Sequence, residues 1–225
     1  MSNRAFKSLV SLAVLVAVVV STAFGFCPAK QIYASASKST TFDKGVNLRA
    51  KMLWLAGSLS NIHGFLKADV DSLNENANFI DEDHIFSAEG EQYPIYGWYK
   101  NGNIYYYTPA DNIYLNEDTS VMFMECDNLT NISGLAHVNT SKVIELDSIF
   151  LGCKSLRDIS PLSAWKFSKL NNLDGLVMYS NVEEAICLNG WDVSKVDKGH
   201  FSHAFEGTPA EAYNRLPYWF PFRSK

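Results

Sequence analysis

The sequence has little cysteine, little proline and no excess of positive charge. Its 225 residues include 4 cysteines and 7 prolines, and the formal net charge is −5. An acidic chain has no general attraction for phosphate backbones, which argues against nucleic-acid binding. So few cysteines exclude a disulfide-rich scaffold. The hydrophobic content of 47% instead predicts a folded globular chain of one domain or two small ones.

The sequence also lacks the motifs that carry common enzyme chemistry. It has no serine in a nucleophile-elbow context, no cysteine in a papain-like context and no glycine-rich phosphate loop. Asp69-x-Asp71 with Asn74 fails as a calcium loop, because Ile80 stands where the last glutamate is needed. We read residues 67–92 as irregular acidic surface, and we expect a protein that is not an enzyme and holds no cofactor.

A long apolar run lies near the N-terminus. Arg4 and Lys7 precede residues 9–26, which contain no charged side chain, and the small residues 34–36 follow as a cleavage site. This order predicts a secretory signal peptide at residues 1–36. A run of about 18 apolar residues also meets the lower limit for an uncleaved membrane anchor. Both interpretations place the rest of the chain outside the cytoplasm, and cleavage would change the net charge from −5 to −8, because it removes three basic residues and no acidic one.

The second half of the sequence repeats itself at an offset of 27 residues. Residues 120–147 superpose on residues 147–174. A third copy follows at an offset of 26, where segment 164–170 returns as segment 190–196. We therefore expect an array of about three units over residues 118–208.

Each unit is predicted to contain one short helix and one short strand. Val143 and Leu146 lie at helical spacing in the predicted helix 141–150, Gly152 follows as a stop, and residues 155–159 are β-prone. Such a unit cannot bury its apolar face alone, so we expect an α/β fold in which units stack as a short leucine-rich-repeat-like solenoid. The expected core consists of Phe123, Leu129, Ile132, Val143, Leu146, Phe150, Leu156, Ile159, Leu170, Leu173, Val196 and Phe205.

These repeats resemble a known family. The resemblance rests on Met122-Phe123-x-x-Cys126-x-x-Leu129-x-x-Ile132-Ser133, on Ile149-Phe150-x-Gly152-Cys153-x-Ser155-Leu156 and on Gly190-Trp191-Asp192-Val193-Ser194-Lys195-Val196. These segments are similar to the 26/27-residue repeat of the BspA-like leucine-rich-repeat surface proteins of bacteria. Segments 50–57 and 94–108 resemble the module that precedes the repeats in many members. The resemblance implies a secreted or surface-attached protein with an adhesive or interaction role, and it supplies no catalytic residues.

Residues 37–117 are predicted to cap the N-terminal end of the array, since a solenoid end exposes its core edge. Asn101-Gly102 between two β-prone runs is a strong hairpin signal, because both residues tolerate positive φ. Residues 44–57 predict a helix with Asp43 as its cap. The predicted inner face of this helix consists of Val46, Ala50, Leu53 and Gly57.

The hairpin carries the candidate binding surface. Aromatic rings stack well on sugar faces and are enriched where proteins bind one another. Strand alternation predicts that Tyr105 and Tyr107 share one face while Tyr106 takes the other. The alternative is that one hairpin face belongs to the core and the other forms a modest exposed patch. The candidate residues are Trp98, Tyr99, Tyr105, Tyr106 and Tyr107.

Two further groups of residues leave alternatives open. His200, His203 and Glu206 would converge on one face of a helix and form a metal site, or the histidines would face outward from a repeat helix. Cys126 and Cys153 occupy equivalent positions of adjacent units, so they form either a disulfide or two buried thiols that pack as small core residues.

The leading interpretation is an exported, non-enzymatic surface or secreted module that binds an extracellular protein or glycan. It touches a membrane only through an uncleaved N-terminal segment. One alternative is a metal-dependent enzyme that uses residues 200–206, and another is a truncated structural remnant without binding activity. The predicted organisation is a signal peptide at 1–36, a cap at 37–117, repeats at 118–208 and a tail at 209–225.

Overall fold

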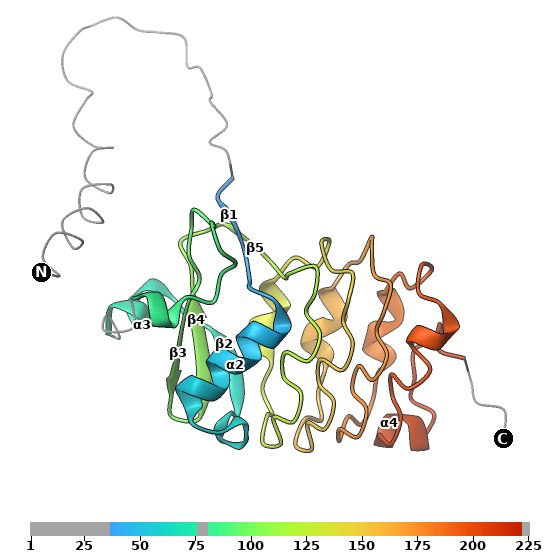
Figure 1. Cartoon of the computed structure of the whole chain (residues 1–225). Coiled ribbons are helices and arrows are strands. Elements are labelled where there is room, and N and C mark those ends of the chain that lie inside the picture. The colour runs from blue at the N-terminus through green and yellow to red at the C-terminus, as the bar shows by residue number, and fades with distance from the viewer. Residues whose placement is uncertain (1–36, 76–80, 222–225) are drawn as a thin grey trace, which may run out of the picture. The chain divides into compact units, whose positions relative to one another are not determined.

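Two small sheets and a helix of 12 residues form the first part of the fold, and a series of similar irregular turns forms the rest (Figure 1). The computed structural model describes residues 37–75 and 81–221. The apolar run 9–26 and the predicted cleavage site at 34–36 lie outside these ranges. Within them, no helix is both long enough and apolar enough to cross a membrane.

Within the described residues, five short strands form two sheets. The larger sheet has the order β2 (Gly64–Lys67), β4 (Asn103–Tyr107) and β3 (Tyr96–Lys100), with β2 parallel and β3 antiparallel to β4. In the smaller sheet, β1 (Ser39–Thr41) pairs in parallel with β5 (Asn112–Tyr114).

The β3–β4 hairpin turns at the two residues that the sequence indicates. Asn101 and Gly102 have φ angles of 51° and 82°. Two consecutive residues with positive φ give the tight turn whose twist matches that of the flanking strands. The strands and the turn of the expected hairpin are therefore present.

Helix α2 (Gly45–Ala56) forms close to its predicted range but buries the opposite face. Leu48 and Met52 are buried, whereas Val46 and Leu53 are 55% and 41% exposed. The predicted inner face is therefore wrong. The helix carries apolar side chains on more than one face, so the sequence pattern alone does not select the face that packs into the core.

The start of α2 is fixed by a close backbone approach. A Cβ atom on Gly45 would lie 2.2 Å from the carbonyl oxygen of Ser120, so only glycine fits there. The predicted cap is also displaced: Lys44 occupies the N-cap position and makes no side-chain cap bond. The Asp43 carboxylate instead accepts hydrogen bonds from the backbone N–H of Lys44 at 2.8 Å and from Asn47 at 2.9 Å.

The segment read as irregular surface contains ordered elements. It includes α3 (Val70–Glu75) and the short 3-10 helix η3 (Glu82–His84). Phe86 is fully buried, and a Cβ atom on Gly97 would lie 2.4 Å from its ring. This segment therefore packs onto the hairpin, and the prediction of an irregular surface is wrong for these residues.

The repeat units form neither the predicted helix nor the predicted strand. Residues 141–150 and 155–159, all of them described, are turns, isolated bridges and irregular backbone. The units instead contain the 3-10 helices η4 (Ser133–His137), η5 (Ser160–Ala164) and η6 (Ile186–Gly190). The prediction of a leucine-rich-repeat-like solenoid with one helix and one strand per unit is therefore wrong. The fold is mixed α/β, with small sheets and few helices.

Left-handed residues explain why no helix forms in the units. The residues at a first repeated position are Val121, Ser148 and Gly175, with φ angles of 57°, 53° and 62°. The residues at a second position are Glu125, Gly152 and Tyr179, with φ angles of 61°, 71° and 55°. Each left-handed residue interrupts a right-handed helix, and the three residues between the two positions are too few to form one.

Backbone hydrogen bonds join equivalent positions of neighbouring units. The N–H groups of Val121, Phe123 and Glu125 donate to the carbonyls of Asp147, Ile149 and Leu151. The same pattern joins Ser148, Phe150 and Gly152 to Asp174, Leu176 and Met178. These N–H groups therefore bond between units rather than along a helix, and the units lie side by side in register (Figure 1).

The expected core residues are all buried, and the most exposed of them is Val196 at 8%. Aromatic rings join this core to the N-terminal sheet, since the rings of Phe65 and Phe123 are 5.1 Å apart. The Tyr106 hydroxyl donates a hydrogen bond of 2.7 Å to the carbonyl of Gly134. The sheet and the first repeat therefore share one core.

Three tryptophans form a ladder through the last units. The rings of Trp165, Trp191 and Trp219 stack in series, with centroid separations of 5.8 and 6.5 Å. Each Nε1–H donates a hydrogen bond to a carbonyl of the preceding unit, at 2.9, 3.0 and 2.9 Å; the acceptors are Leu135, Leu162 and Leu188. The predicted tail, which begins with α4 (Pro209–Ala212), thus supplies the last ring of the ladder.

Candidate interaction surface

The structure separates the five aromatic residues of the predicted binding surface. Trp98 and Tyr106 are only 1% and 0% exposed, whereas Tyr99, Tyr105 and Tyr107 are half-buried. Tyr106 faces the core, and Tyr105 stacks on Trp98 with a centroid distance of 5.8 Å. A fully buried ring offers no surface to a partner, so only the three half-buried tyrosines remain available.

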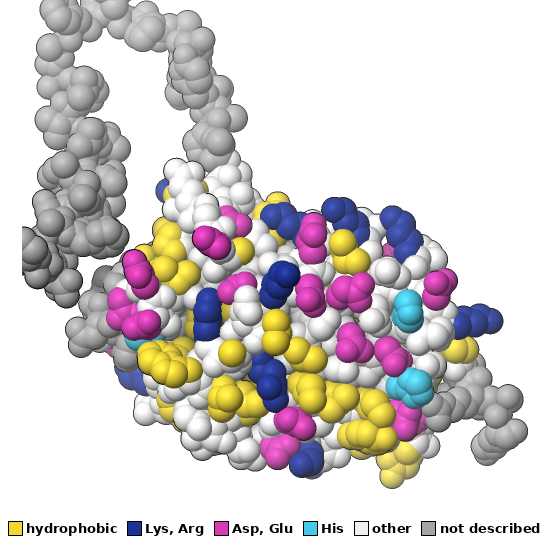
Figure 2. Space-filling model, in the orientation of Figure 1, with side chains coloured by type: hydrophobic (Ala, Val, Ile, Leu, Met, Phe, Trp, Pro, Cys, Tyr) yellow, Lys and Arg dark blue, Asp and Glu magenta, His cyan; other side chains and the backbone are white. Residues whose placement is uncertain are grey.

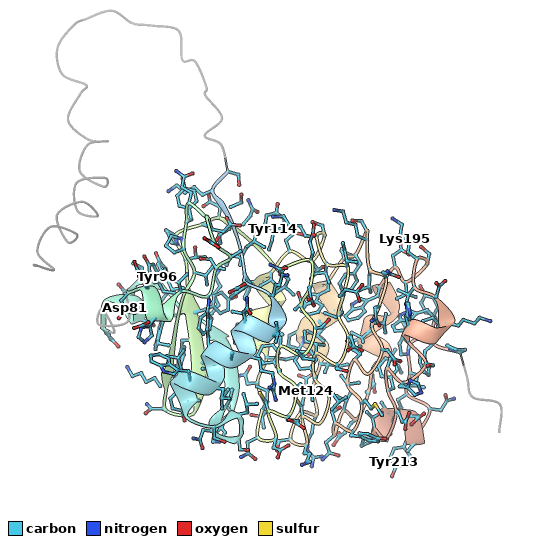
Figure 3. The ribbon with its side chains drawn as sticks, viewed as in Figure 1. Asp81, Tyr96, Tyr114, Met124, Lys195 and Tyr213 are labelled. Carbon is cyan, nitrogen blue, oxygen red and sulfur yellow. The ribbon has the colours of Figure 1, made fainter. Side chains whose placement is uncertain are left out.

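A different apolar surface crosses the repeats (Figure 2). Met124, Leu151 and Met178 occupy equivalent positions of three consecutive units and are half-buried. Their register is set by Glu125 and Gly152, whose N–H groups donate to the carbonyls of Leu151 and Met178. We call these three side chains the apolar row. Figure 2 shows hydrophobic side chains gathered in a band across this face, and Figure 3 labels Met124 within it.

Exposed tyrosines lie towards the C-terminal end of the row. Tyr179 follows Met178 in the chain and is 53% exposed. A Cβ atom on Gly207 would lie 2.5 Å from the Tyr179 ring, so this glycine leaves the space in which the ring lies. Tyr213, which directly follows α4, is 71% exposed (Figure 3). Exposed aromatic rings beside an apolar row are typical of protein-binding surfaces.

Helix α2 lies beside the first unit of the row. The Arg49 Nε–H donates a hydrogen bond of 3.0 Å to the carbonyl oxygen of Met124, and an Arg49 terminal nitrogen lies 3.2 Å from the Glu125 carboxylate. Leu53 and Trp54 on the same helix are exposed. Leu53 lies one helical turn after Arg49, so α2 brings an exposed apolar side chain close to the first unit of the row.

Carboxylates lie along one side of the row. Asp147 and Asp174 precede Leu151 and Met178 by four residues each, at equivalent positions of two units. Partial burial raises the pKa of Asp147, and the negative charges of Asp174 and Asp118 raise it further. These like charges repel one another, so this edge of the row attracts positive charge.

His203 connects Asp174 to the last unit. Its backbone N–H donates to Asp174 Oδ1 at 2.8 Å, its Nδ1 lies 3.0 Å from Asp174 Oδ2, and its Nε2 lies 4.0 Å from Glu206 Oε2. The Tyr179 hydroxyl donates a hydrogen bond of 3.1 Å to Glu206, which raises the pKa of Tyr179. These side chains form one polar network at the C-terminal end of the row.

This network does not have the geometry of a catalytic triad. The Ser202 Oγ atom lies 3.2 Å from Nδ1 of His203, the same nitrogen that faces Asp174. In a triad, the serine and the aspartate face opposite nitrogens of the ring. His203 is therefore not placed to take a proton from Ser202 while Asp174 orients it.

The residues of the alternative metal site, His200, His203 and Glu206, do not lie on the helix that would bring them together. Lys198–His200 form the 3-10 helix η7, and residues 201–207 are turns. His203 and Glu206 are neighbours in the polar network described above. In the part of the chain that the structure describes, no three His, Cys, Asp or Glu side chains are grouped so that they could hold a metal ion.

Cys126 and Cys153 are free, buried thiols. The Cys153 Sγ donates a hydrogen bond of 3.1 Å to the carbonyl of Phe123. Burial raises the pKa of Cys126 to about 12 and that of Cys153 well above its ordinary value. Of the two alternatives for this pair, the structure has the buried thiols.

An open cavity of about 310 Å³ lies beside the third cysteine, Cys187. Arg157 and Glu183 line it and pair with each other at 2.5 Å. The other lining residues are Asp158, Ser160 and Glu184. The single arginine of this lining is thus paired with a neighbouring carboxylate.

Comparisons with known proteins give a family match over the repeats. Residues 115–218 match a family model described as a Mycoplasma protein of unknown function, DUF285. The match covers less than half of the chain. It corrects the resemblance to BspA-like leucine-rich-repeat surface proteins, because the matching model is not of that family. No curated protein and no solved structure matches the chain.

Proposed function

We propose that this chain is a non-enzymatic interaction module of an exported protein, which binds an extracellular protein through the apolar row. The observation that carries the proposal is the alignment of Met124, Leu151 and Met178 on three adjacent units, next to the exposed ring of Tyr179. Methionine side chains adapt to varied partner shapes, and tyrosine is enriched at protein interfaces.

A protein partner fits this surface better than a glycan does. Sugar hydroxyls need polar partners when they leave water, and the side chains of Met124, Leu151 and Met178 offer none. Apolar side chains of a protein partner gain free energy when they bury the same surface. Among the hairpin tyrosines that were expected to stack on sugars, Tyr106 is fully buried.

The extracellular location is part of the proposal and rests on the N-terminal sequence. The basic residues Arg4 and Lys7, the apolar run 9–26 and the small residues 34–36 follow the order of a secretory signal. We expect the processed chain to begin at Ser37 and to be recovered from the medium. N-terminal sequencing of the recovered protein checks this, and a membrane-bound product that retains residues 1–36 would support the anchor alternative.

A photoreactive amino acid at position 151 tests the binding surface. We expect it to crosslink to an extracellular protein, and excess unlabelled wild-type chain should suppress the product while a Met178→Lys chain should not. The matched control places the photoreactive residue at Ile186, an exposed apolar side chain in η6 outside the row. Equal labelling from positions 151 and 186 would contradict the assignment of the row.

A further inference from the structure

The spacing of the apolar row selects the kind of segment that can lie across it. Hydrogen-bonded neighbouring chains lie about 4.8 Å apart, so two steps from Met124 to Met178 span about 10 Å. Residues i and i+7 of an α-helix are about 10.5 Å apart along its axis. Residues on the same face of an extended strand recur at about 6.6 Å and 13 Å. These distances match neither the spacing of about 4.8 Å between neighbouring units nor the spacing of about 10 Å across two units. The row therefore matches a helix that crosses the units.

The length of the row limits the helix to about two turns of close contact. The N–H of Tyr179 donates to the carbonyl of Glu206, as the N–H of Gly152 donates to that of Met178. Glu206 thus takes the fourth position of the row and ends its apolar part with a carboxylate. A fitting helix needs three apolar anchors, with polar residues beyond them.

The charges beside the row specify the flank of the helix. Asp147 and Asp174 lie along one side, and their mutual repulsion contributes to the raised pKa of Asp147. Lysine or arginine side chains above these carboxylates relieve that repulsion, whereas acidic side chains add to it. The complementary helix is therefore basic on the side that faces Asp147 and Asp174.

We propose that the apolar row binds an amphipathic helix of a protein partner, with apolar residues at i, i+3 or i+4, and i+7, and with basic residues on the flank that faces Asp147 and Asp174. This inference rests on the proposed function, because it names the partner's structure at the same surface. Met124 and Met178 hold the outer anchors of the helix, and Leu151 contacts the central one.

Titration of the full chain with three designed peptides tests the inference. Each peptide has about 15 residues, a length at which a helix is marginally stable, and a fluorescent label. The first has leucines at i, i+4 and i+7 and lysines along one flank. The second replaces one central polar residue of the first by proline, and the third replaces every lysine by glutamate. We expect the first peptide to bind at least about tenfold more tightly than the other two.

Variants of the chain show whether the row is the site. Leu151→Lys and Met178→Lys should each weaken binding of the first peptide by at least about tenfold, while Ile186→Lys should leave it unchanged. Both row variants should unfold at the same urea concentration as the wild-type chain. If Leu151→Lys does not fold, the binding measured for Met178→Lys decides whether the row is the site. If Ile186→Lys loses as much peptide affinity as the row variants, or if the row variants lose none, the row is not the binding site.

The outcomes separate this inference from the proposed function. If the proline peptide binds as tightly as the first peptide, the partner segment need not be a helix. If the glutamate peptide binds as tightly as the first peptide, the basic flank is not required. Failure of all three peptides to bind also overturns the inference. The proposed function fails on a different result, namely the absence of any competed crosslink from position 151.

Discussion

Replacing Trp191 by phenylalanine tests the tryptophan ladder that holds the last units together. The Trp191 ring is buried, it stacks between Trp165 and Trp219, and its Nε1–H donates to the carbonyl of Leu162 at 3.0 Å. That carbonyl keeps a second hydrogen bond, from the backbone N–H of Trp165, so the substitution does not leave it without a partner.

The expected cost follows from these contacts. Loss of one buried hydrogen bond costs about 1 kcal/mol when the acceptor keeps another partner. The smaller ring loses buried area and leaves a void, which costs about 1–2 kcal/mol more. Trp219→Phe removes the equivalent hydrogen bond to Leu188 from a half-buried ring, and water can replace that donor, so about 1 kcal/mol is expected.

Urea unfolding followed by far-ultraviolet circular dichroism measures both variants. We expect the free energy of unfolding to fall by about 2–3 kcal/mol for Trp191→Phe and by about 1 kcal/mol for Trp219→Phe, with an unchanged slope. If Trp191→Phe costs no more than Trp219→Phe, the reasoning about a buried, hydrogen-bonded ladder is refuted.

Three further predictions concern stability and thiol chemistry. Gly45→Ala should lower the free energy of unfolding by about 3 kcal/mol, because its Cβ would lie 2.2 Å from a backbone carbonyl oxygen. The control Gly57→Ala should lower it by about 1 kcal/mol, because only its φ of 72° is strained. Equal losses for the two variants in urea unfolding would contradict the close approach at Gly45. Asp147→Asn should stabilise the fold at pH 7 by about 0.5 kcal/mol or less, because the raised pKa means that the ionised form is disfavoured. This gain should vanish as the pH falls towards 3.8, so a gain that persists at pH 3 would count against the repulsion. Alkylation of the native chain should reach the half-buried Cys187 well before the buried Cys126. Mass spectrometry at successive times measures the order, and earlier alkylation of Cys126 would contradict the prediction.

The 27-residue period predicts the core of the repeats but not their backbone. Phe123 and Phe150 recur at one offset and are both buried, because equivalent positions of adjacent units share one environment. The left-handed turns give the same three- and four-residue apolar spacing as a helix. Gly152 is a residue type that signals positive φ, but Val121 and Ser148 adopt it without any such signal. Tertiary hydrogen bonding between units, not local propensity, holds them there.

The candidate surface has a signal in the sequence that the expected helix obscured. Met124 and Leu151 each follow a core phenylalanine directly, and an apolar residue recurs there 27 residues later at Met178. The helix predicted over residues 141–150 ends before Leu151, so it assigns this position to neither the buried nor the exposed face. The positions line up because Glu125 and Gly152 each turn the chain with positive φ and donate to the next unit.

Methyl-group NMR of the methionines tests most directly whether the apolar row is one binding surface. Met124 and Met178 lie in the row, while Met52 and Met122 are fully buried and serve as internal controls. During titration with the basic helical peptide, the methyl signals of Met124 and Met178 should shift along a single binding curve while those of Met52 and Met122 stay in place. A shift of only one row methionine, or of neither at saturation, would contradict a surface that spans the three units.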